Sequence, residues 1–422
     1  MSNRRRLGLR LPVPDDLWIE ILVSLPVKSL LRFQCVSKSW KSIISSPTFI
    51  STHTQHSERI HNHAHHLLHY SRYKDGGVMQ RQYLLFHIND SFSDSGFQKL
   101  EYPCQIRGGG FLNVLDCRGL ILFAPLVRKN GLESLVLWNP AIRMSMTLTQ
   151  PYKFDTTDRE YHIYGFGFDH TSNDYKVLRM VLIFESRTRR FLSHAKLYKL
   201  RTGTWETVRV PEDFQYSIVE HRQALVNGAS HWVGYHKRDM AFYFPELVVL
   251  LFHTCDEEFR VMKLPDCLSS LDAYAAKLGV SGGLLSLIEY SFQGGASVWL
   301  MKEYGVVKSW TKQFTLKDGC FRPMFSFWNN EMILELESKN GWTGLLYDLK
   351  THKLIKNERI KSDQFNRSII AKNTFVETLV LLNEVHAIRE CTNYVRKDLW
   401  CDSEKIKEEK RKNCGEDYMD VC

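Results

Sequence analysis

Turn-forming residues that recur along most of the chain constrain its fold more than any other feature. They lie 43 to 55 residues apart, at Gly76, Gly119, Asn173, Gly228, Gly283, Asn330 and Asn373. Each one separates two short segments rich in Val, Leu, Ile and aromatic residues, which is the pattern of a β-hairpin. A repeat of this length predicts an array of similar β units rather than one continuous sheet.

A second series lies between these turns and has a similar spacing. Aromatic residues in strand-like segments recur every 47 to 60 residues, at Phe86, Trp138, Tyr198, Phe252, Trp299 and Tyr347. The two series together give each unit about four strands, which is one blade of a β-propeller. Six units fit, with a seventh hairpin near Asn373. We expect residues 375–382 to pair with the early strand around Leu67, because ring closure removes exposed sheet edges. An irregular pair of β-sandwiches is the alternative.

The residues before this region predict three short helices. Pro14 suits a first helical turn, and the apolar residues that follow at helical spacing are Leu17, Ile21, Leu22 and Leu25. Pro26 ends this helix, because proline disfavours helical geometry at the preceding residue. Two further helices are expected at 27–34 and 36–44, with Pro47 as the stop. So short a segment cannot bury its apolar surface alone, so it packs on the rest of the chain or on a partner.

These helical residues resemble the F-box, the module that docks on a Skp-type adaptor in cullin-based ubiquitin ligases. The run Leu-Pro-Val-Lys-Ser-Leu-Leu-Arg-Phe at 25–33 carries much of the likeness. The resemblance implies that the adaptor is bound through Pro14, Leu17, Ile21, Leu22, Leu25, Pro26, Leu30, Val36 and Trp40. Some of these residues must pack the module's own core, and the sequence does not divide the two sets. The alternative is an ordinary three-helix bundle without a partner.

The β region resembles the plant F-box-associated domain. The motifs that carry the likeness are Gly-Phe-Gly-Phe-Asp at 165–169, Asn-Asp-Tyr-Lys-Val at 173–177 and Leu-Trp-Asn-Pro at 137–140. With the helical segment, they resemble S-locus F-box-like and constitutive-defence-type proteins. Read from their chemistry, Asp169 and Asp174 satisfy turn backbones, and Trp138 and Trp232 fill blade cores. A catalytic role for Asp169 or His231 is the alternative.

The resulting fold class is α+β in segregated domains, with a small N-terminal three-helix F-box and an all-β propeller of six or seven blades. The boundaries expected are a disordered basic arm at 1–11, the F-box at 12–52, the propeller at 60–385 and a charged tail at 386–422. The arm holds the only dense cluster of basic residues in a chain of net charge +9. The β region has no clustered basic residues of the kind that bind nucleic acid.

Cysteine spacing and hydropathy indicate the cellular compartment of the protein. The ten cysteines show no C-x-x-C spacing, which argues against a zinc ribbon or a RING-like site. No run of 18 apolar residues exists, so no membrane span is expected, and the N-terminus lacks an apolar signal core. Thiols without a secretion signal indicate a reducing compartment, the cytoplasm or the nucleus.

Motifs for catalysis are absent from the sequence. There is no phosphate loop and no G-x-S-x-G elbow. The histidine-rich run from His53 to His69 reads partly as a strand, on which neighbouring side chains face opposite sides, so we expect no metal site. We therefore expect no catalytic residue and no cofactor.

The function expected is that of the substrate-recognition subunit of an SCF-type (Skp–cullin–F-box) E3 ubiquitin ligase. The expected partners are a Skp-type adaptor, through it a cullin, and an unknown target protein, without nucleic acid or membrane. Two other functions stay open: a non-degradative binding protein, and a propeller-based enzyme that uses the F-box for regulation.

Overall fold

Four helices open the part of the chain that the computed structural model describes: α1 (Asp15–Val23), α2 (Val27–Phe33), α3 (Lys38–Ile44) and α4 (Pro47–Ile60). The residues described are 15–60, 65–75, 78–88, 97–100, 112–125, 135–148, 159–185, 190–212, 214–219, 222–236, 245–290, 295–316, 321–328, 331–338, 341–348, 351, 353–355 and 376–381. Within these ranges, no helix is long and apolar enough to cross a membrane.

The helix boundaries follow local chemistry. Pro26 precedes α2 with φ −59°, and the Ser37 hydroxyl accepts a hydrogen bond from the backbone N–H of Trp40, which caps α3. The prediction for Pro47 was wrong. Pro47 does not stop the third helix; it is the first residue of a fourth, a position where its missing N–H costs nothing. The start of the histidine-rich run therefore lies on α4.

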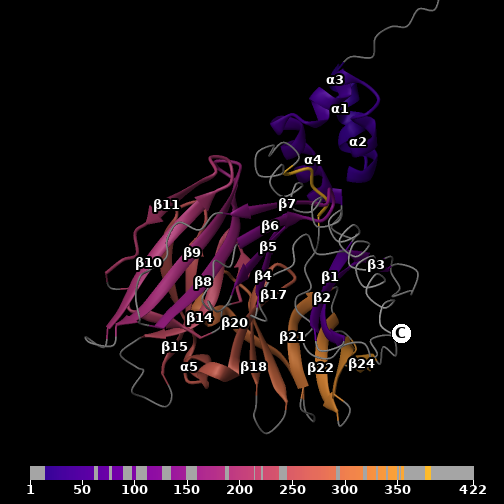
Figure 1. The fold of residues 1–422 in the computed structure, drawn as a ribbon. Helices are drawn as coiled ribbons and strands as arrows, with labels where there is room; N and C mark the ends of the chain where they lie inside the picture. Colours follow the sequence, from indigo (N-terminus) through magenta and orange to yellow (C-terminus); the bar gives the residue numbers. More distant parts are fainter. Residues whose placement is uncertain are drawn as a thin grey trace, which may run out of the picture.

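Six antiparallel sheets follow the helices (Figure 1). The first contains β1 (His65–Asp75), β2 (Val78–Ile88) and β3 (Phe97–Leu100). The second contains β4 (Leu112–Cys117), β5 (Leu120–Pro125), β6 (Leu135–Asn139) and β7 (Met144–Leu148). The third contains β8 (Arg159–Asp169), β9 (Asp174–Glu185), β10 (Arg190–Lys199) and β11 (Thr204–Val208).

The remaining three sheets continue the same order along the chain. The fourth contains β12 (Tyr216–Ile218), β13 (Ala224–Val226), β14 (Ala229–His236), β15 (Leu247–His253) and β16 (Glu258–Lys263). A short helix α5 (Asp266–Ser269) and the 3₁₀ turn η3 (Ala273–Ala275) lead to the fifth sheet. It contains β17 (Ala276–Ser281), β18 (Leu284–Tyr290), β19 (Ala296–Met301) and β20 (Trp310–Leu316). The 3₁₀ turn η4 (Val307–Ser309) precedes β20. The sixth contains β21 (Phe321–Trp328), β22 (Glu331–Ser338), β23 (Gly341–Asp348) and β24 (Lys353–Ile355).

The prediction of six or seven blades is not what the described residues form. Four sheets are four-stranded meanders in sequence order, whereas the β12–β16 sheet has an additional strand and the β1–β3 sheet has three strands. The architecture is a helical N-terminal region followed by an all-β propeller with four regular blades. The added strand β13 pairs only with β14, beside the path of that sheet.

Both spaced series coincide with structural positions. Four of the turn residues have positive φ values: +83° at Gly119, +53° at Asn173, +71° at Gly228 and +78° at Gly283. Three of them lie in the turn between the first two strands of a sheet, and Gly228 lies in the turn between β13 and β14. These positions need a residue that tolerates the left-handed region. The six aromatic residues lie on β2, β6, β10, β15, β19 and β23. Gly76, Asn330 and Asn373 lie outside the described residues.

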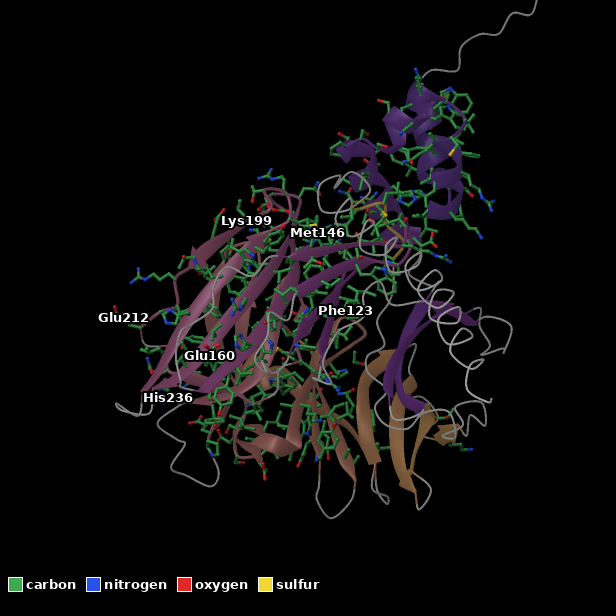
Figure 2. All side chains as sticks on the ribbon, in the orientation of Figure 1. Phe123, Met146, Glu160, Lys199, Glu212 and His236 are labelled. Atoms are coloured by element: carbon green, nitrogen blue, oxygen red, sulfur yellow. The ribbon has the colours of Figure 1, made fainter. Side chains whose placement is uncertain are left out.

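Five of the sheets contact their neighbours mainly through one strand each. β4 contacts β8, β14 contacts both β8 and β17, and β17 contacts β21. The buried indoles of Trp138 and Trp232 are among the largest side chains of the interior, as the sequence predicts. Lys199 and Met146 lie on the side of the propeller toward the helices, while Glu160 and His236 lie on the opposite side (Figure 2). The propeller therefore has one face toward the helical module and one face away from it.

Candidate functional site

The helical module carries large apolar side chains that are exposed. Leu17 and Ile21 lie one turn apart on α1 with 48 % and 50 % of their surface exposed, and Val36, between α2 and α3, is 64 % exposed. Large apolar side chains on a folded surface usually mark a binding site when they gather on one module. These three residues are therefore available to a partner, as the resemblance requires.

Other members of the predicted adaptor-binding set form the core of the module. Leu22 and Leu30 are 1 % and 0 % exposed, and Leu25 is half-buried against the same cluster. Because they are enclosed by the chain's own side chains, they hold the helices together.

Three members have intermediate positions or are not described. Trp40 is half-buried, with its ring 5.3 Å from Trp18 and 5.0 Å from Phe33. Pro26 is exposed at the start of α2. Pro14 lies outside the described residues. The structure thus divides the described members of this set where the sequence alone did not, and it leaves their adaptor contact a prediction.

Helix α4 attaches the module to the propeller. Glu58 accepts two hydrogen bonds from the guanidinium of Arg118, in the turn between β4 and β5. That guanidinium also lies 3.9 Å over the ring of Phe168, and the Tyr175 hydroxyl donates to the Arg118 carbonyl at 3.0 Å. A cation held by an ion pair and an aromatic face fixes the direction of both elements.

Residues 376–381 form the second attachment, and here the prediction was wrong. The described part of the expected strand 375–382 is not a strand and does not pair with β1. It lies between the helices and the β4–β7 sheet. The amide of Asn139, at the end of β6, donates to the carbonyls of Thr378 and Val380 at 2.8 Å each.

The same segment reaches the helices from its other side. A carboxylate oxygen of Glu377 accepts the backbone N–H of Val27 at 3.1 Å. Because Pro26 offers α2 no side-chain cap, Glu377 satisfies a free donor at the positive end of that helix. The hydroxyls of Thr54 and Thr378 are 2.8 Å apart. We name residues 376–381 the clasp.

The clasp closes one continuous hydrophobic core. Leu379 and Leu381, both buried, belong to the same cluster as Leu22 on α1 and Leu122 on β5. Helices, clasp and first regular blade therefore share one interior, and the module is not a flexible appendage. Sequence reasoning missed Glu58, Arg118 and Glu377, because pairs this far apart in the chain leave no local pattern.

Asp169 and His231 have structural environments. Asp169 accepts the backbone N–H of Thr171 at 2.8 Å, as its turn role predicts, and the Nζ of Lys176 at 2.7 Å. Burial alone would raise the pKa of Asp169, but hydrogen bonds from Lys176, Ser172 and Thr171 hold it well below the ordinary value. Lys176 also donates to Glu257 at 2.7 Å, which joins two neighbouring sheets.

His231 is fully buried on β14 and is hydrogen-bonded at both ring nitrogens. Nδ1 donates to the Ala224 carbonyl at 3.0 Å, so Nε2 accepts from the Tyr304 hydroxyl at 2.8 Å. Burial lowers the pKa of His231 to about 4, so the ring is neutral at pH 7. Both ring nitrogens are therefore engaged in hydrogen bonds within the chain. Across the described ranges, no three His, Cys, Asp or Glu side chains gather as metal ligands would.

Comparison with known proteins agrees with both parts of this geometry. Residues 12–52 match the F-box domain, and residues 87–395 match the F-box associated beta propeller domain. The F-box/kelch-repeat protein At3g23880 of Arabidopsis thaliana is 27 % identical over 339 residues, which cover 78 % of this chain and 86 % of that protein. The F-box protein CPR1 of Arabidopsis thaliana is 28 % identical over 369 residues, which cover 81 % and 83 %. The chain belongs to the F-box proteins with an F-box-associated β-propeller domain.

Proposed function

We propose that this chain is the substrate-recognition subunit of an SCF-type E3 ubiquitin ligase. The observation that carries the proposal is the exposure of the apolar side chains of Leu17, Ile21 and Val36 on a module that matches the F-box domain. In this role these side chains bind a Skp-type adaptor and through it a cullin, and the propeller holds a target protein. The four cysteines that the structure describes are free thiols, which suits the cytoplasm or the nucleus.

The role requires no chemistry from this chain. A ligase receptor raises the local concentration of the target and orients it toward a conjugating enzyme. The attachment of the F-box through α4 and the clasp supports this role, because a fixed angle between adaptor and propeller fixes where the target is presented. The catalytic steps then belong to the other subunits.

Adaptor binding in vitro tests the proposal. The double variant Leu17→Asp/Ile21→Asp removes two apolar contacts worth about 1.5–3 kcal/mol each and places charges in the contact. Titration calorimetry with a purified Skp-type adaptor should show affinity at least about 100-fold lower than for the intact chain. Val261→Asp, on an exposed valine of β16, is the matched control and should bind as the intact chain does. Equal affinity of the double variant would overturn the proposal.

A further inference from the structure

The second and third helices of the F-box belong to a segment that carries positive charge only. Residues 21–57 contain four Lys or Arg residues and no Asp or Glu. Lys28 and Arg32 lie on α2, Lys38 and Lys41 lie on α3, and all four are exposed. Within the described ranges, no carboxylate pairs with any of these four side chains. Their charges are therefore available to a partner.

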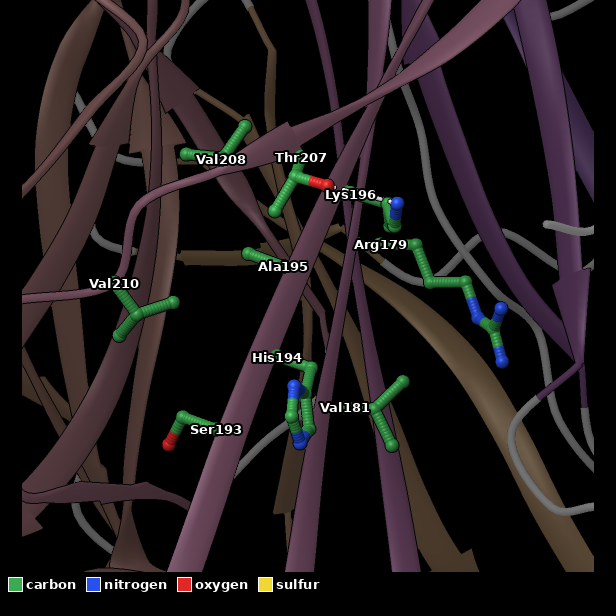
Figure 3. A pocket seen from close by; sticks show the side chains of 9 residues that line it. All are labelled: Arg179, Val181, Ser193, His194, Ala195, Lys196, Thr207, Val208 and Val210. Atoms are coloured by element: carbon green, nitrogen blue, oxygen red, sulfur yellow. Dashed lines mark hydrogen bonds between the residues drawn. The ribbon is translucent and has the colours of Figure 1, made fainter. Parts of the chain in front are cut away.

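Two lysines of the propeller illustrate the usual alternative, a cation that is engaged within the chain. Lys199 pairs with Glu206 at 2.7 Å. Figure 3 shows a cavity of about 260 Å³ lined by β9, β10 and β11, where the Nζ of Lys196 donates to the Thr207 hydroxyl at 2.8 Å. The cations of α2 and α3 differ from these lysines, because no described side chain neutralises or fixes them.

Two of the four cations occupy positions that do not favour their own helices. Lys28 lies in the first turn of α2 and Lys38 is the first residue of α3, where the positive end of the helix dipole repels a cation. Lys28 also lies one turn from Arg32, and like charges at this spacing destabilise a helix. Neither first turn contains an acidic residue. Residues that break a local rule in this way point to a function outside the free chain.

The basic residues lie close to the exposed apolar residues of the module. Val36, which is 64 % exposed, lies between Arg32 and Lys38 in the chain. The rings of Trp40 on α3 and Trp18 on α1 pack 5.3 Å apart, so α3 lies against the helix that carries the other exposed apolar side chains. Both helices are on the side of the module away from the propeller (Figure 1). A partner that covers the apolar residues from this side also comes close to the cations.

We propose that Lys28, Arg32, Lys38 and Lys41 form a basic face that attracts an acidic surface of the Skp-type adaptor. This inference rests on the proposed function and adds the chemistry of the partner, whose carboxylates lie opposite α2 and α3 around the apolar contact. Charges at the rim of an interface act mainly on association, because their attraction extends about 8 Å at physiological salt. The basic face speeds the encounter, and the apolar residues hold the complex.

Biolayer interferometry of the full chain with a purified Skp-type adaptor measures both rates. Lys28→Glu/Lys38→Glu should lower the association rate at least about tenfold and change the dissociation rate much less. Lys28→Gln/Lys38→Gln removes the charges without reversing them and should lie between this variant and the intact chain. Lys263→Glu/Lys308→Glu, at two exposed lysines of the propeller, makes the same change in net charge and should associate at nearly the rate of the intact chain.

Salt dependence and thermal unfolding separate the effect of charge from an effect on folding. Raising the salt concentration from about 0.05 to about 0.5 M should slow association of the intact chain and affect the Lys28→Glu/Lys38→Glu chain much less. Because a carboxylate in a first helical turn is favoured, this variant should melt at the temperature of the intact chain or above it. Slow association by a chain of undiminished stability then reports the lost attraction alone.

The outcomes distinguish this inference from the ligase role. If the Lys28→Glu/Lys38→Glu chain binds the adaptor at the rate of the intact chain and without salt dependence, the basic face is refuted and the ligase role stands. If the intact chain does not bind the adaptor, both fail. Unchanged adaptor kinetics, with loss of binding to vesicles of phosphatidylcholine and phosphatidylserine, would assign the basic face to a lipid surface and also overturn the proposal.

Discussion

The clasp should open when Asn139 is replaced by alanine. The Asn139 side chain is fully buried and donates to two backbone carbonyls, those of Thr378 and Val380, at 2.8 Å each. A buried acceptor that loses its partner costs about 1–3 kcal/mol. Val380 is half-buried, so water can rehydrate its carbonyl and the lower part of the range applies. The expected loss is about 2–3 kcal/mol in the free energy that holds the clasp closed.

Amide hydrogen exchange measured by mass spectrometry reads this quantity directly. A loss of 2–3 kcal/mol makes exchange of residues 376–381 about 30- to 150-fold faster, because each 1.4 kcal/mol is a factor of ten. Asn139→Asp should have at least the same effect, since it places a carboxylate oxygen against both carbonyls.

The matched control is a buried polar side chain that makes no hydrogen bond. Ser286 is fully buried, and its hydroxyl has no hydrogen-bond partner in the described part of the chain. Ser286→Ala therefore breaks no bond and should leave exchange at 376–381 unchanged, with stability equal or slightly higher. If residues 376–381 of Asn139→Ala exchange at a rate within threefold of that in the intact chain, the account of the clasp is refuted.

Three further changes have defined outcomes. Gly119→Ala should lower the melting temperature and speed exchange of the clasp, because Gly119 has φ +83° and an added Cβ would lie 2.1 Å from the Val376 carbonyl oxygen; unchanged exchange contradicts the packing. The free energy of unfolding should fall by up to about 3 kcal/mol as pH falls from about 6.5 to about 4, because His231 binds a proton in the unfolded chain but stays neutral when buried. Urea unfolding at several pH values should show this pH dependence in the intact chain and its loss in His231→Gln, and an equal pH dependence in both contradicts it. Leu22→Asp should unfold the helices by circular dichroism, whereas Leu17→Asp should not, and equal spectra contradict the division of the face.

The repeat of the propeller was predictable because its turns depend on local backbone chemistry. Positive φ values favour glycine and asparagine, so positions such as Gly119 and Asn173 reveal the hairpins without any tertiary information. The aromatic residues on the strands carry the same period, since each blade needs a large side chain in its interior. The number of strands in each blade could not be predicted from the sequence, because strands such as β13 are only three residues long and have no strong hydrophobic pattern.

The clasp and the division of the F-box residues depend on contacts distant in sequence. Residues 376–381 are rich in β-branched and apolar residues, as strands are, but the side chain of Asn139 satisfies two of their carbonyls, and they form no ladder with another strand. Likewise, Ile21 and Leu22 are neighbours of one apolar stripe, and only packing against the other helices decides which one is buried. Pro47 was misread because proline both begins and ends helices.

A paired affinity purification from plant cells tests the central proposal most directly. One bait is the intact chain, and the other carries Leu17→Asp and Ile21→Asp, which leave the buried core of the module untouched. The ligase role predicts that adaptor and cullin are lost with the variant while another protein stays bound and accumulates. Retention of the adaptor by the variant, or an intact bait that recovers no adaptor, would contradict it.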